Sequence, residues 1–319
     1  MLDLLLKNLF LESKIDTEKA FFLFDKRYKN EIITSSNIKH KFIQNREIKR
    51  IKFYYTNRKK INFCFCFSNF PPPKFIKCRS LIYFQNLTLL NSRNLINTLK
   101  RSYLKFLINK NQKFIFQTNS TKEAFNIKIN SRVEKVIFPF FENKLDIHPK
   151  KKRSNSYFYP AAFTKNKNHK LLIESFIEFA KHEKSIIYLY LTLNDEEFKI
   201  LLNKKLIPKN LRIKNLGYLS YKNTQLYLSK SKFLIFPSIE ESFGLPLIEA
   251  TIIRTKIIAS DLDYCNEIIN PSLKFNPFDR TSLYKTLLES INYKTIPFSS
   301  LKIKNKIKDL IKLIEIENK

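Results

Sequence analysis

The sequence predicts an α/β protein made of two Rossmann-like units that face each other across a cleft, and three observations lead to this prediction. The chain has 319 residues, enough for two domains of ordinary size. Short apolar runs alternate with helical stretches along its length, as expected for units built around parallel sheets. A polar, basic segment at 141–155 separates two such series. We therefore expect a first domain over 1–145 and a second over 146–319.

The first domain is predicted to begin with a helix, followed by five strands. The opening segment MLDLLLKNLFL is interrupted by Asp3 and Lys7, and no small-residue cleavage site follows it. This pattern indicates a helix and not a signal peptide. Helical stretches at 92–108 and 121–128 lie between apolar runs of strand length. The runs are AFFLF (20–24), INFCFCF (61–67), SLIYF (80–84), KFIFQ (113–117) and VEKVIF (133–138).

The second domain is predicted to repeat the alternation more regularly. Its strand candidates are 156–160, 185–191, 211–217, 232–236 and 256–260. Its helix candidates are 168–182, 195–205, 221–230, 279–292 and 299–317.

Glycine is nearly absent from the chain, which excludes several kinds of binding loop. Gly217 and Gly244 are the two glycines. A GxGxxG dinucleotide loop, a GxxxxGK phosphate loop and a GxSxG nucleophile elbow cannot be written with them. Both glycines are therefore candidates for positions where the backbone approaches a ligand or takes a positive φ.

The formal net charge of +31 favours an anionic partner, although the composition offers a second explanation. Lys, Asn, Ile, Phe and Tyr are abundant while Gly and Ala are scarce, as A/T-rich codons produce. The basic residues are dispersed, and Lys150–Arg153 is the longest run. We expect attraction to an anionic membrane surface. Nucleic-acid binding is disfavoured, because the aromatic residues fall in predicted strand cores.

The cysteines are predicted to be buried free thiols in a reducing compartment. Cys64 and Cys66 share one face of a predicted strand, and neither they nor Cys78 and Cys265 form a C-x-x-C pair. The four histidines show no ligand spacing, which leaves a zinc site as the weaker alternative.

The segment PSIEESFGLPLIEA (237–250) contains the strongest candidate site. It follows a predicted buried strand, and ligands of open α/β sheets bind at the carboxyl ends of strands. Gly244 lets the backbone approach a ligand, and the helix that follows presents free N–H groups suited to a phosphate. Glu241 and Glu249 are eight residues apart, so they can contact different parts of one extended ligand. A carboxylate can accept two hydrogen bonds from a vicinal diol such as that of a ribose.

This segment resembles the C-terminal signature of the GT-B retaining glycosyltransferases of the family 4 type (glycosyl transferases group 1), written P-S-x-x-E-x-F-G-L-P-x-x-E-A. Glu241 and Glu249 fall on its two glutamates. KIIASDLDYCNEII and FNPFD resemble the next two blocks of that family, and FYPAAFTKNKNHKLLIESF (158–176) resembles an upstream strand, loop and helix. The resemblance is dense over 156–292. The first half is loosely similar to the acceptor domains of O-antigen and polysaccharide transferases.

The resemblance implies a role for each matching residue. Glu241 and Lys167 would be catalytic, with Glu241 near the donor sugar and Lys167 neutralising the charge of the leaving diphosphate. Glu249 would bind the ribose hydroxyls. The further donor-binding residues would be Phe243, Gly244, Leu245, Gly217 and Lys165. The resemblance also implies no metal, because basic side chains and a helix terminus neutralise the diphosphate in this fold. No other cofactor is expected, because the nucleotide sugar is itself a substrate.

Three features depart from the family pattern. The arginine that precedes the lysine is missing from Tyr159–Pro160–Ala161, where Lys165 can supply a point charge instead. The histidine of related acceptor domains is missing from Tyr83–Phe84–Gln85–Asn86. The chain starts in the helix that follows the family's first strand and Gly-rich loop, so we expect the first domain to lack that strand.

The resemblance as a whole implies a glycosyltransferase that moves a hexosyl group from a nucleotide sugar to a saccharide acceptor. The acceptor is expected to be lipid-linked, and the reaction to belong to cell-surface polysaccharide biosynthesis. Retention of configuration, metal independence and a cytoplasmic location, peripheral on the inner membrane face, are expected from the family. The alternative is a catalytically impaired remnant that still binds a nucleotide sugar. A basic nucleic-acid-binding protein is a third interpretation, which rests on net charge alone.

Overall fold

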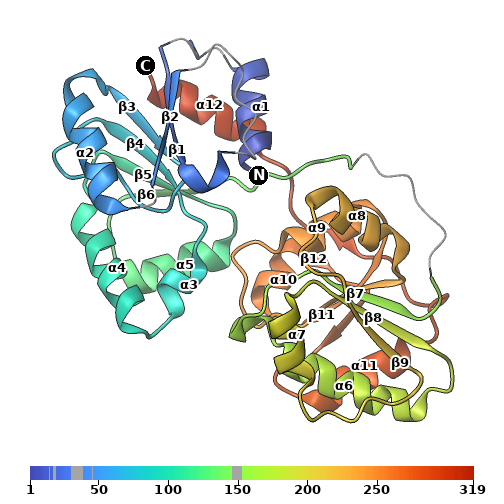
Figure 1. The fold of residues 1–319 in the computed structure, drawn as a ribbon. Helices are drawn as coiled ribbons and strands as arrows, with labels where there is room; N and C mark the ends of the chain where they lie inside the picture. Colours follow the sequence, from blue (N-terminus) through green and yellow to red (C-terminus); the bar gives the residue numbers. More distant parts are fainter. Residues whose placement is uncertain (14, 17–18, 30–38, 45, 146–152) are drawn as a thin grey trace. The chain divides into compact units, whose positions relative to one another are not determined.

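The computed structural model describes all residues except 14, 17–18, 30–38, 45 and 146–152. It divides into two compact units: unit 1 comprises Met1–Phe141 and Asn305–Lys319, and unit 2 comprises Glu142–Lys304 (Figure 1). The central sheet of each unit is parallel, so the predicted α/β class is confirmed. The middle of the predicted linker, with most of the basic run at 150–153, lies outside the described residues.

The main sheet of unit 1 has four parallel strands in the order β3-β4-β5-β6. All four correspond to predicted strands: β3 (Phe63–Cys66), β4 (Arg79–Tyr83), β5 (Gln112–Phe116) and β6 (Glu134–Ile137). The predicted strand near the start is β1 (Phe21–Asp25), but it pairs apart from the main sheet with β2 (Lys39–Ile43). The sequence analysis missed β2 because its residues, KHKFI, are half polar and lack an apolar run.

Helices cover both faces of the main sheet of unit 1. One face packs against α2 (Glu47–Asn57), α3 (Leu87–Asn91), α4 (Leu95–Leu107) and α5 (Asn119–Ile129). The other face packs against α1 (Leu2–Glu12) and α12 (Ile307–Glu317). Burial of these aliphatic and aromatic side chains supplies the main stabilisation of the unit.

The last helix corrects the predicted division of the chain, which assigned it to the second domain. Ile307, Leu310, Ile311 and Ile314 of α12 are buried in one cluster with Leu5 of α1 and with the strand residues Leu81, Tyr83 and Ile115, all in unit 1. Their helical spacing reveals an apolar side but not which sheet will cover it. The helix is also shorter than predicted, because residues 300–301 form the short strand β14 (Ser300–Leu301).

Unit 2 has a parallel sheet of six strands in the order β13-β11-β10-β7-β8-β9. These are β7 (Ser156–Tyr159), β8 (Ile187–Leu191), β9 (Leu211–Asn215), β10 (Phe233–Phe236), β11 (Lys256–Ser260) and β13 (Leu273–Phe275). From the central strand β7 the chain proceeds to β8 and β9 on one side and then returns to β10 on the other. The strand order therefore reverses between β7 and β10, and such a switch point is where open α/β sheets bind ligands.

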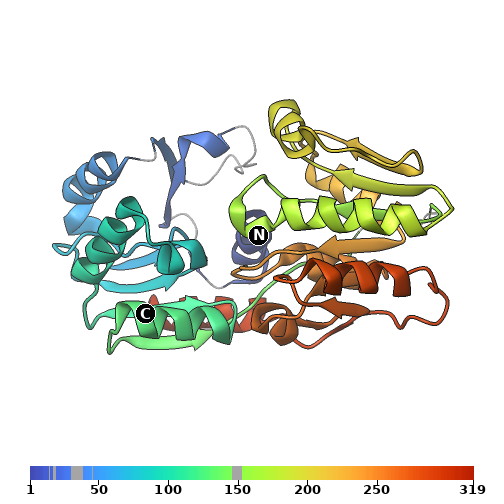
Figure 2. The same ribbon diagram turned by 90° about the horizontal axis from the view of Figure 1, so that it is seen from below.

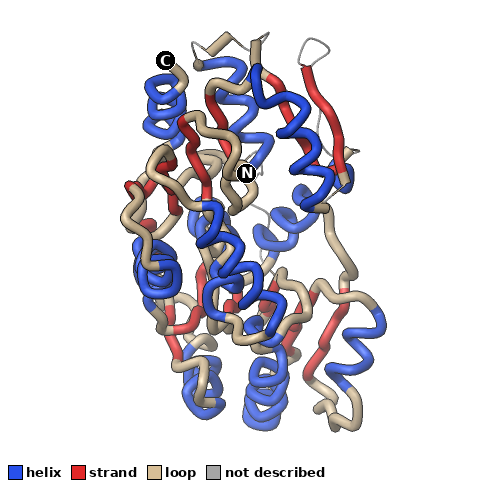
Figure 3. Tube along the Cα trace, turned by 90° about the vertical axis from the view of Figure 1, so that its left-hand side faces the viewer, coloured by secondary structure: helices blue, strands red, loops and turns tan. Residues whose placement is uncertain are grey.

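The helices of unit 2 alternate with its strands, as Figure 3 shows along the chain trace. They are α6 (His169–His182), α7 (Asp195–Leu202), α8 (Tyr221–Lys230), α9 (Leu245–Ile252), α10 (Asp263–Ile268) and α11 (Arg280–Glu289). Helices α6 and α11 lie side by side on one face of the sheet (Figure 2). The short strands β12 (Ile269–Asn270) and β14 pair antiparallel beside it. Each described helix of the chain is too short or too polar to cross a membrane.

Candidate functional site

The candidate site lies at the switch point of unit 2, where the loops that follow β7 and β10 are joined. The backbone N–H of Ile239 donates to the carbonyl oxygen of Asn166 at 2.8 Å. The Asn166 side-chain amide donates in turn to the carbonyl oxygen of Glu240 at 3.1 Å. The buried Tyr159, at the end of β7, donates to the carbonyl oxygen of Lys167 at 2.9 Å. These bonds hold the two loops in a fixed register, so their side chains are positioned before any ligand binds.

The two predicted catalytic residues meet across this junction. Lys167 ends a single turn of 3₁₀-helix after β7, and its ammonium forms an ion pair and hydrogen bond with the Glu241 carboxylate. Their side chains are only 20% and 14% exposed. An ion pair this sheltered is screened weakly by solvent, so loss of either partner leaves the other charge poorly compensated. The sequence analysis assigned each residue a role but did not predict their contact.

Glu249 lies in α9 and is nearly buried, with 9% of its surface exposed. Burial raises the pKa of its carboxyl to about 7, while the neighbouring Tyr221 side chain acts in the opposite direction. Near neutral pH the carboxyl is therefore divided between its protonated and ionised forms. Tyr221, the first residue of α8, was not predicted as a site residue. The one sequence signal that could have identified Tyr221 as a site residue is its position directly after the loop that follows β9.

Both glycines take the left-handed conformation that was anticipated for them. Gly244 has φ +67° and precedes the first residue of α9, where a Cβ atom would lie 3.0 Å from Cδ1 of Leu247. Gly217 has φ +64°, but a Cβ atom there would meet open space. Glycine is therefore favoured at Gly244 by both its positive φ and the close approach of Leu247, and at Gly217 by its positive φ alone.

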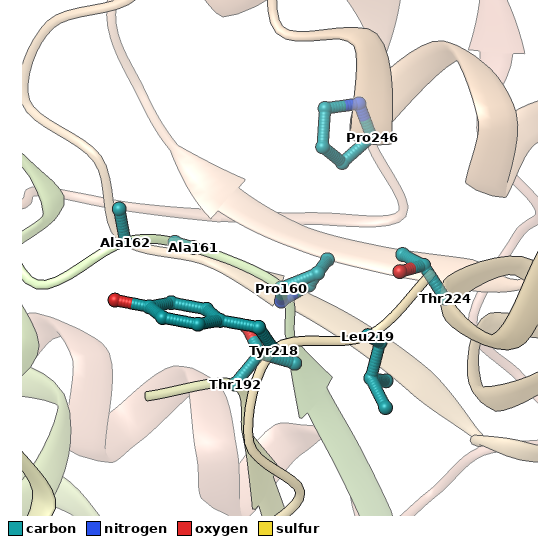
Figure 4. A pocket seen from close by; sticks show the side chains of 8 residues that line it. All are labelled: Pro160, Ala161, Ala162, Thr192, Tyr218, Leu219, Thr224 and Pro246. Atoms are coloured by element: carbon teal, nitrogen blue, oxygen red, sulfur yellow. The ribbon is translucent and has the colours of Figure 1, made fainter. Parts of the chain in front are cut away.

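A pocket of about 240 Å³ opens beside these glycines, at the carboxyl ends of β7, β8 and β9. Figure 4 shows the Tyr218 ring beside the Pro160–Ala162 backbone, with Thr224 and Pro246 on the other side. The lining residues are Pro160, Ala161, Ala162, Thr192, Tyr218, Leu219, Thr224 and Pro246. The lining carries no charged side chain, so its polar character comes from hydroxyl and backbone groups.

The remaining predicted residues lie around this pocket in different ways. Phe243 has a buried side chain, which therefore offers a ligand no contact. Leu245 is half-buried in the first turn of α9, and Lys165 is exposed in the same turn as Lys167. The pocket residues that follow β8 and β9, Thr192 and Tyr218, were missed because neighbouring strand ends can be recognised only once the strand order is known.

His169, the first residue of α6, packs among aromatic side chains. Its buried ring lies between those of Tyr159 and Phe163, at centroid distances of 5.0 and 5.5 Å. Burial lowers the pKa of His169 to about 4, which keeps the imidazole neutral.

The cysteines follow the sequence prediction in most respects. Cys64, Cys66 and Cys265 are buried free thiols, and Cys78 is half-buried. Over the described ranges, no three His, Cys, Asp or Glu side chains gather as metal ligands. Metal independence of the reaction stays a prediction.

Comparison with known proteins connects this site to one family. Residues 140–276 match the family of glycosyl transferases group 1. The O-antigen chain mannosyltransferase RfbU of Salmonella typhimurium is 28% identical over 192 residues, which is 58% of this chain and 53% of the relative. This chain thus spans about half the length of the curated relative that it matches.

Solved structures share the fold at low sequence identity. Sucrose-phosphate synthase from Thermosynechococcus elongatus is 14% identical, with a TM-score of 0.63 over 93% of this chain and 83% of that one. A glycosyltransferase from Rickettsia africae is 16% identical, with a TM-score of 0.60 over 88% and 80%. HepE from Anabaena, solved in complex with UDP-glucose, is 12% identical, with a TM-score of 0.60 over 88% and 85%. The chain thus has the GT-B-like fold, and its residues 140–276 match the model of the glycosyl transferases group 1 family.

Proposed function

We propose that this protein is a glycosyltransferase that moves a hexosyl group from a nucleotide sugar to a saccharide acceptor in cell-surface polysaccharide biosynthesis. The observation that carries the proposal is the sheltered Lys167–Glu241 pair at the switch point, inside the region that matches the family. The printed name of the curated relative makes mannose the first hexosyl group to test. A lipid-linked acceptor and a cytoplasmic, membrane-peripheral location are part of the proposal.

The nucleotide is proposed to occupy the pocket and the adjoining first turn of α9. The uncharged pocket, with the ring of Tyr218 and the hydroxyls of Thr192 and Thr224, suits a planar base that stacks and forms hydrogen bonds. Glu249 would accept hydrogen bonds from the ribose hydroxyls in its ionised form. The N–H of Leu245, the first residue of α9, would face the diphosphate, since Pro246 has no N–H and the N–H of Leu247 donates to the Gly244 carbonyl oxygen at 2.9 Å.

Lys167 is proposed to stabilise the negative charge that develops on the diphosphate as the bond to the sugar breaks. A pre-positioned cation is effective in this role because it does not have to reorganise during the reaction. Glu241 holds the ammonium in place before the donor arrives and would lie near the donor sugar. Lys165 is a second cation in the same turn. Retention of configuration and catalysis without a metal complete the proposed mechanism.

Nucleotide binding and turnover test the proposal separately. Calorimetry with GDP, UDP and dTDP should detect binding of at least one nucleotide by the wild type. Glu249→Ala should weaken it about tenfold, the equivalent of roughly 1.4 kcal/mol. Absence of affinity for all three nucleotides would overturn the proposal.

A specific observation favours one alternative, a remnant that binds the donor without transferring its sugar. Pro160 and Ala161 line the pocket at the place where the family pattern has its arginine. Incubation with a panel of nucleotide sugars and saccharide acceptors, with detection of the glycosylated product, distinguishes the two. Nucleotide binding without product from any pair would favour the remnant.

A further inference from the structure

Helix α4 of unit 1 turns a row of large apolar side chains toward solvent. Leu95, Leu99 and Phe106 are 74%, 62% and 57% exposed, and Ile96 is exposed beside them. Spacings of four and seven residues place the first three on one side of the helix. The opposite side is held in the core by Leu104 and Leu107. A helix that covers a sheet normally turns polar side chains outward, so this second apolar side is unusual.

Helix α2 has an exposed apolar side of the same kind. Ile48, Ile51 and Tyr55 are exposed and are separated by three and four residues, which aligns them along the helix. Both helices pack on the same face of the main sheet of unit 1 (Figure 1).

Contacts between the two helices join these rows into one surface. The Tyr103 hydroxyl of α4 donates to the Glu47 carboxylate at the start of α2, at 2.6 Å. Phe75, in the loop between β3 and β4, meets the Tyr55 ring edge-on at 6.0 Å, and the ammonium of its neighbour Lys74 lies 4.1 Å from the Phe106 ring centroid. We call this the α2–α4 surface; its exposed apolar residues are Ile48, Ile51, Tyr55, Phe75, Leu95, Ile96, Leu99 and Phe106.

The charge around the α2–α4 surface has a single sign. Residues 48–122 contain sixteen Lys or Arg and no Asp or Glu. The carboxylate of Glu47, directly before this stretch, is bound by Arg50 at 2.6 Å and by Tyr103. The exposed cations next to the apolar residues are Arg58, Lys74, Arg93, Lys100 and Lys105. A partner that binds this surface must therefore take up its apolar side chains and must also carry negative charge to compensate its cations.

We propose that the α2–α4 surface binds an anionic lipid bilayer. Its apolar side chains would enter the boundary between headgroups and acyl chains, and its cations would contact anionic headgroups. An apolar protein surface would not compensate this charge, and an acidic one would leave the apolar rows without partners. The inference rests on the membrane-peripheral location in the proposed function and assigns it to a surface of unit 1, and its test uses no sugar nucleotide, so that it can fail independently of the transfer reaction.

Vesicle flotation of the full-length protein tests the apolar part of the proposal. The wild type should float with vesicles of phosphatidylcholine and phosphatidylglycerol, and far less with phosphatidylcholine alone. Leu95→Ser with Leu99→Ser should lower the partition coefficient about tenfold or more. The matched control is Ile200→Ser with Leu206→Ser, at positions of unit 2 that are 66% and 92% exposed, which should leave the partition coefficient unchanged. Equal partition of the wild type and the Leu95/Leu99 variant would overturn the proposal.

A charge variant tests whether position matters or only total charge. Lys100→Gln with Lys105→Gln should lower binding to the anionic vesicles about tenfold or more, since each lysine near the surface contributes about fivefold. Lys199→Gln with Lys209→Gln removes the same charge from exposed positions of unit 2 and should have little effect. Equal losses for both pairs would show that general charge attracts the protein, which contradicts a defined surface.

Molar mass measured by light scattering identifies the rival occupant, a second copy of the chain. The wild type and the Leu95/Leu99 variant should have the same molar mass. A dimeric wild type and a monomeric variant would assign the surface to self-association and overturn membrane binding. Circular dichroism should give the same unfolding temperature for both, because the substituted side chains are exposed.

Discussion

Unit 1 and unit 2 differ in the residues that form their left-handed turns. Unit 1 contains no glycine, and among its described residues Asn69 and Asn130 take positive φ. Unit 2 also uses other residues at such turns, but it keeps both glycines of the chain, at Gly217 and Gly244. Asparagine tolerates the left-handed conformation better than most residues. Asparagine therefore serves in place of glycine at ordinary left-handed turns. The two glycines of the chain lie in unit 2, beside the candidate site.

The same contrast extends to what each unit offers a partner. Unit 2 brings the ends of its strands together around a small pocket and a sheltered ion pair. Unit 1 offers the broad α2–α4 surface, with exposed apolar side chains and cations. In the two proposals above, unit 2 recognises a compact ligand and unit 1 recognises an extended surface.

The largest expected effect tests whether the two units are stable independently. Leu310 of α12 is fully buried in unit 1, so Leu310→Ala should lower the free energy of unfolding of that unit by about 3–5 kcal/mol. Denaturant unfolding followed by residue-specific hydrogen exchange should locate the loss in unit 1. Ile316→Ala, at an exposed position of the same helix, is the control and should change stability by less than about 0.5 kcal/mol. An equal loss in unit 2 would contradict independent units.

Removal of the Lys167 ammonium should be the most damaging change in unit 2 for activity. Lys167→Ala is expected to lower kcat about 10²–10³-fold, because a pre-positioned charge is lost where the leaving group becomes negative. Lys165→Ala, in the same turn, should have a smaller effect because its side chain is exposed and less fixed. Steady-state transfer assays compare the two variants. Equal losses of kcat in the two variants would contradict the special role proposed for Lys167.

The pH dependence of nucleotide binding should follow Glu249. The folded carboxyl has its pKa raised to about 7, whereas the unfolded one titrates near 4.5. The ionised form accepts both ribose hydrogen bonds more strongly than the protonated form does, so nucleotide affinity should rise about tenfold as the pH increases through 7. Calorimetry across this range should show the rise in the wild type and a flat profile in Glu249→Gln.

The same shift predicts the opposite trend for stability. Between pH 4.5 and 7 the folded carboxyl retains a proton that the unfolded chain has lost, so the free energy of unfolding should fall as the pH rises across this window. Above pH 7 the decrease is complete. A wild-type protein without this slope relative to Glu249→Gln would show that the carboxyl titrates normally.

The smallest expected effect compares the two glycines directly. Gly244→Asn should cost about 1–2 kcal/mol, because asparagine accepts the positive φ but its Cβ would lie 3.0 Å from the Leu247 side chain. Gly217→Asn should stay within about 0.5 kcal/mol, because its Cβ would enter open space. Thermal unfolding of both variants measures the difference. Equal costs would show that backbone conformation alone decides where glycine is retained.

Sequence reasoning recovered the parts of the fold that depend on local pattern. Strand β11 and helix α8 begin and end where they were predicted, because continuous apolar runs and capping residues mark them. The site segment 237–250 was found because its glycine, glutamates and proline stand together in the sequence. These signals lie within one element or the loop beside it.

What sequence reasoning missed depends on strand order and long-range packing. Thr192 and Tyr218 join one pocket only because β8 and β9 lie beside β7 in the sheet. The Lys167–Glu241 contact spans two loops that are distant in the sequence. The amphipathic spacing of α12 is evident in the sequence, yet the strands against which its apolar side packs lie about 200 residues earlier. A single sequence carries no local trace of these pairings.

The return of α12 to unit 1 has a consequence for synthesis on the ribosome. Unit 2 is one continuous segment, Glu142–Lys304, so it can fold as soon as its last strands emerge. The strand residues Leu81, Tyr83 and Ile115 of unit 1 wait for residues 307–317, which are translated after unit 2. Unit 1 is thus begun before unit 2 and completed after it, and its apolar sheet face stays open to chaperones or to misassembly while unit 2 is translated.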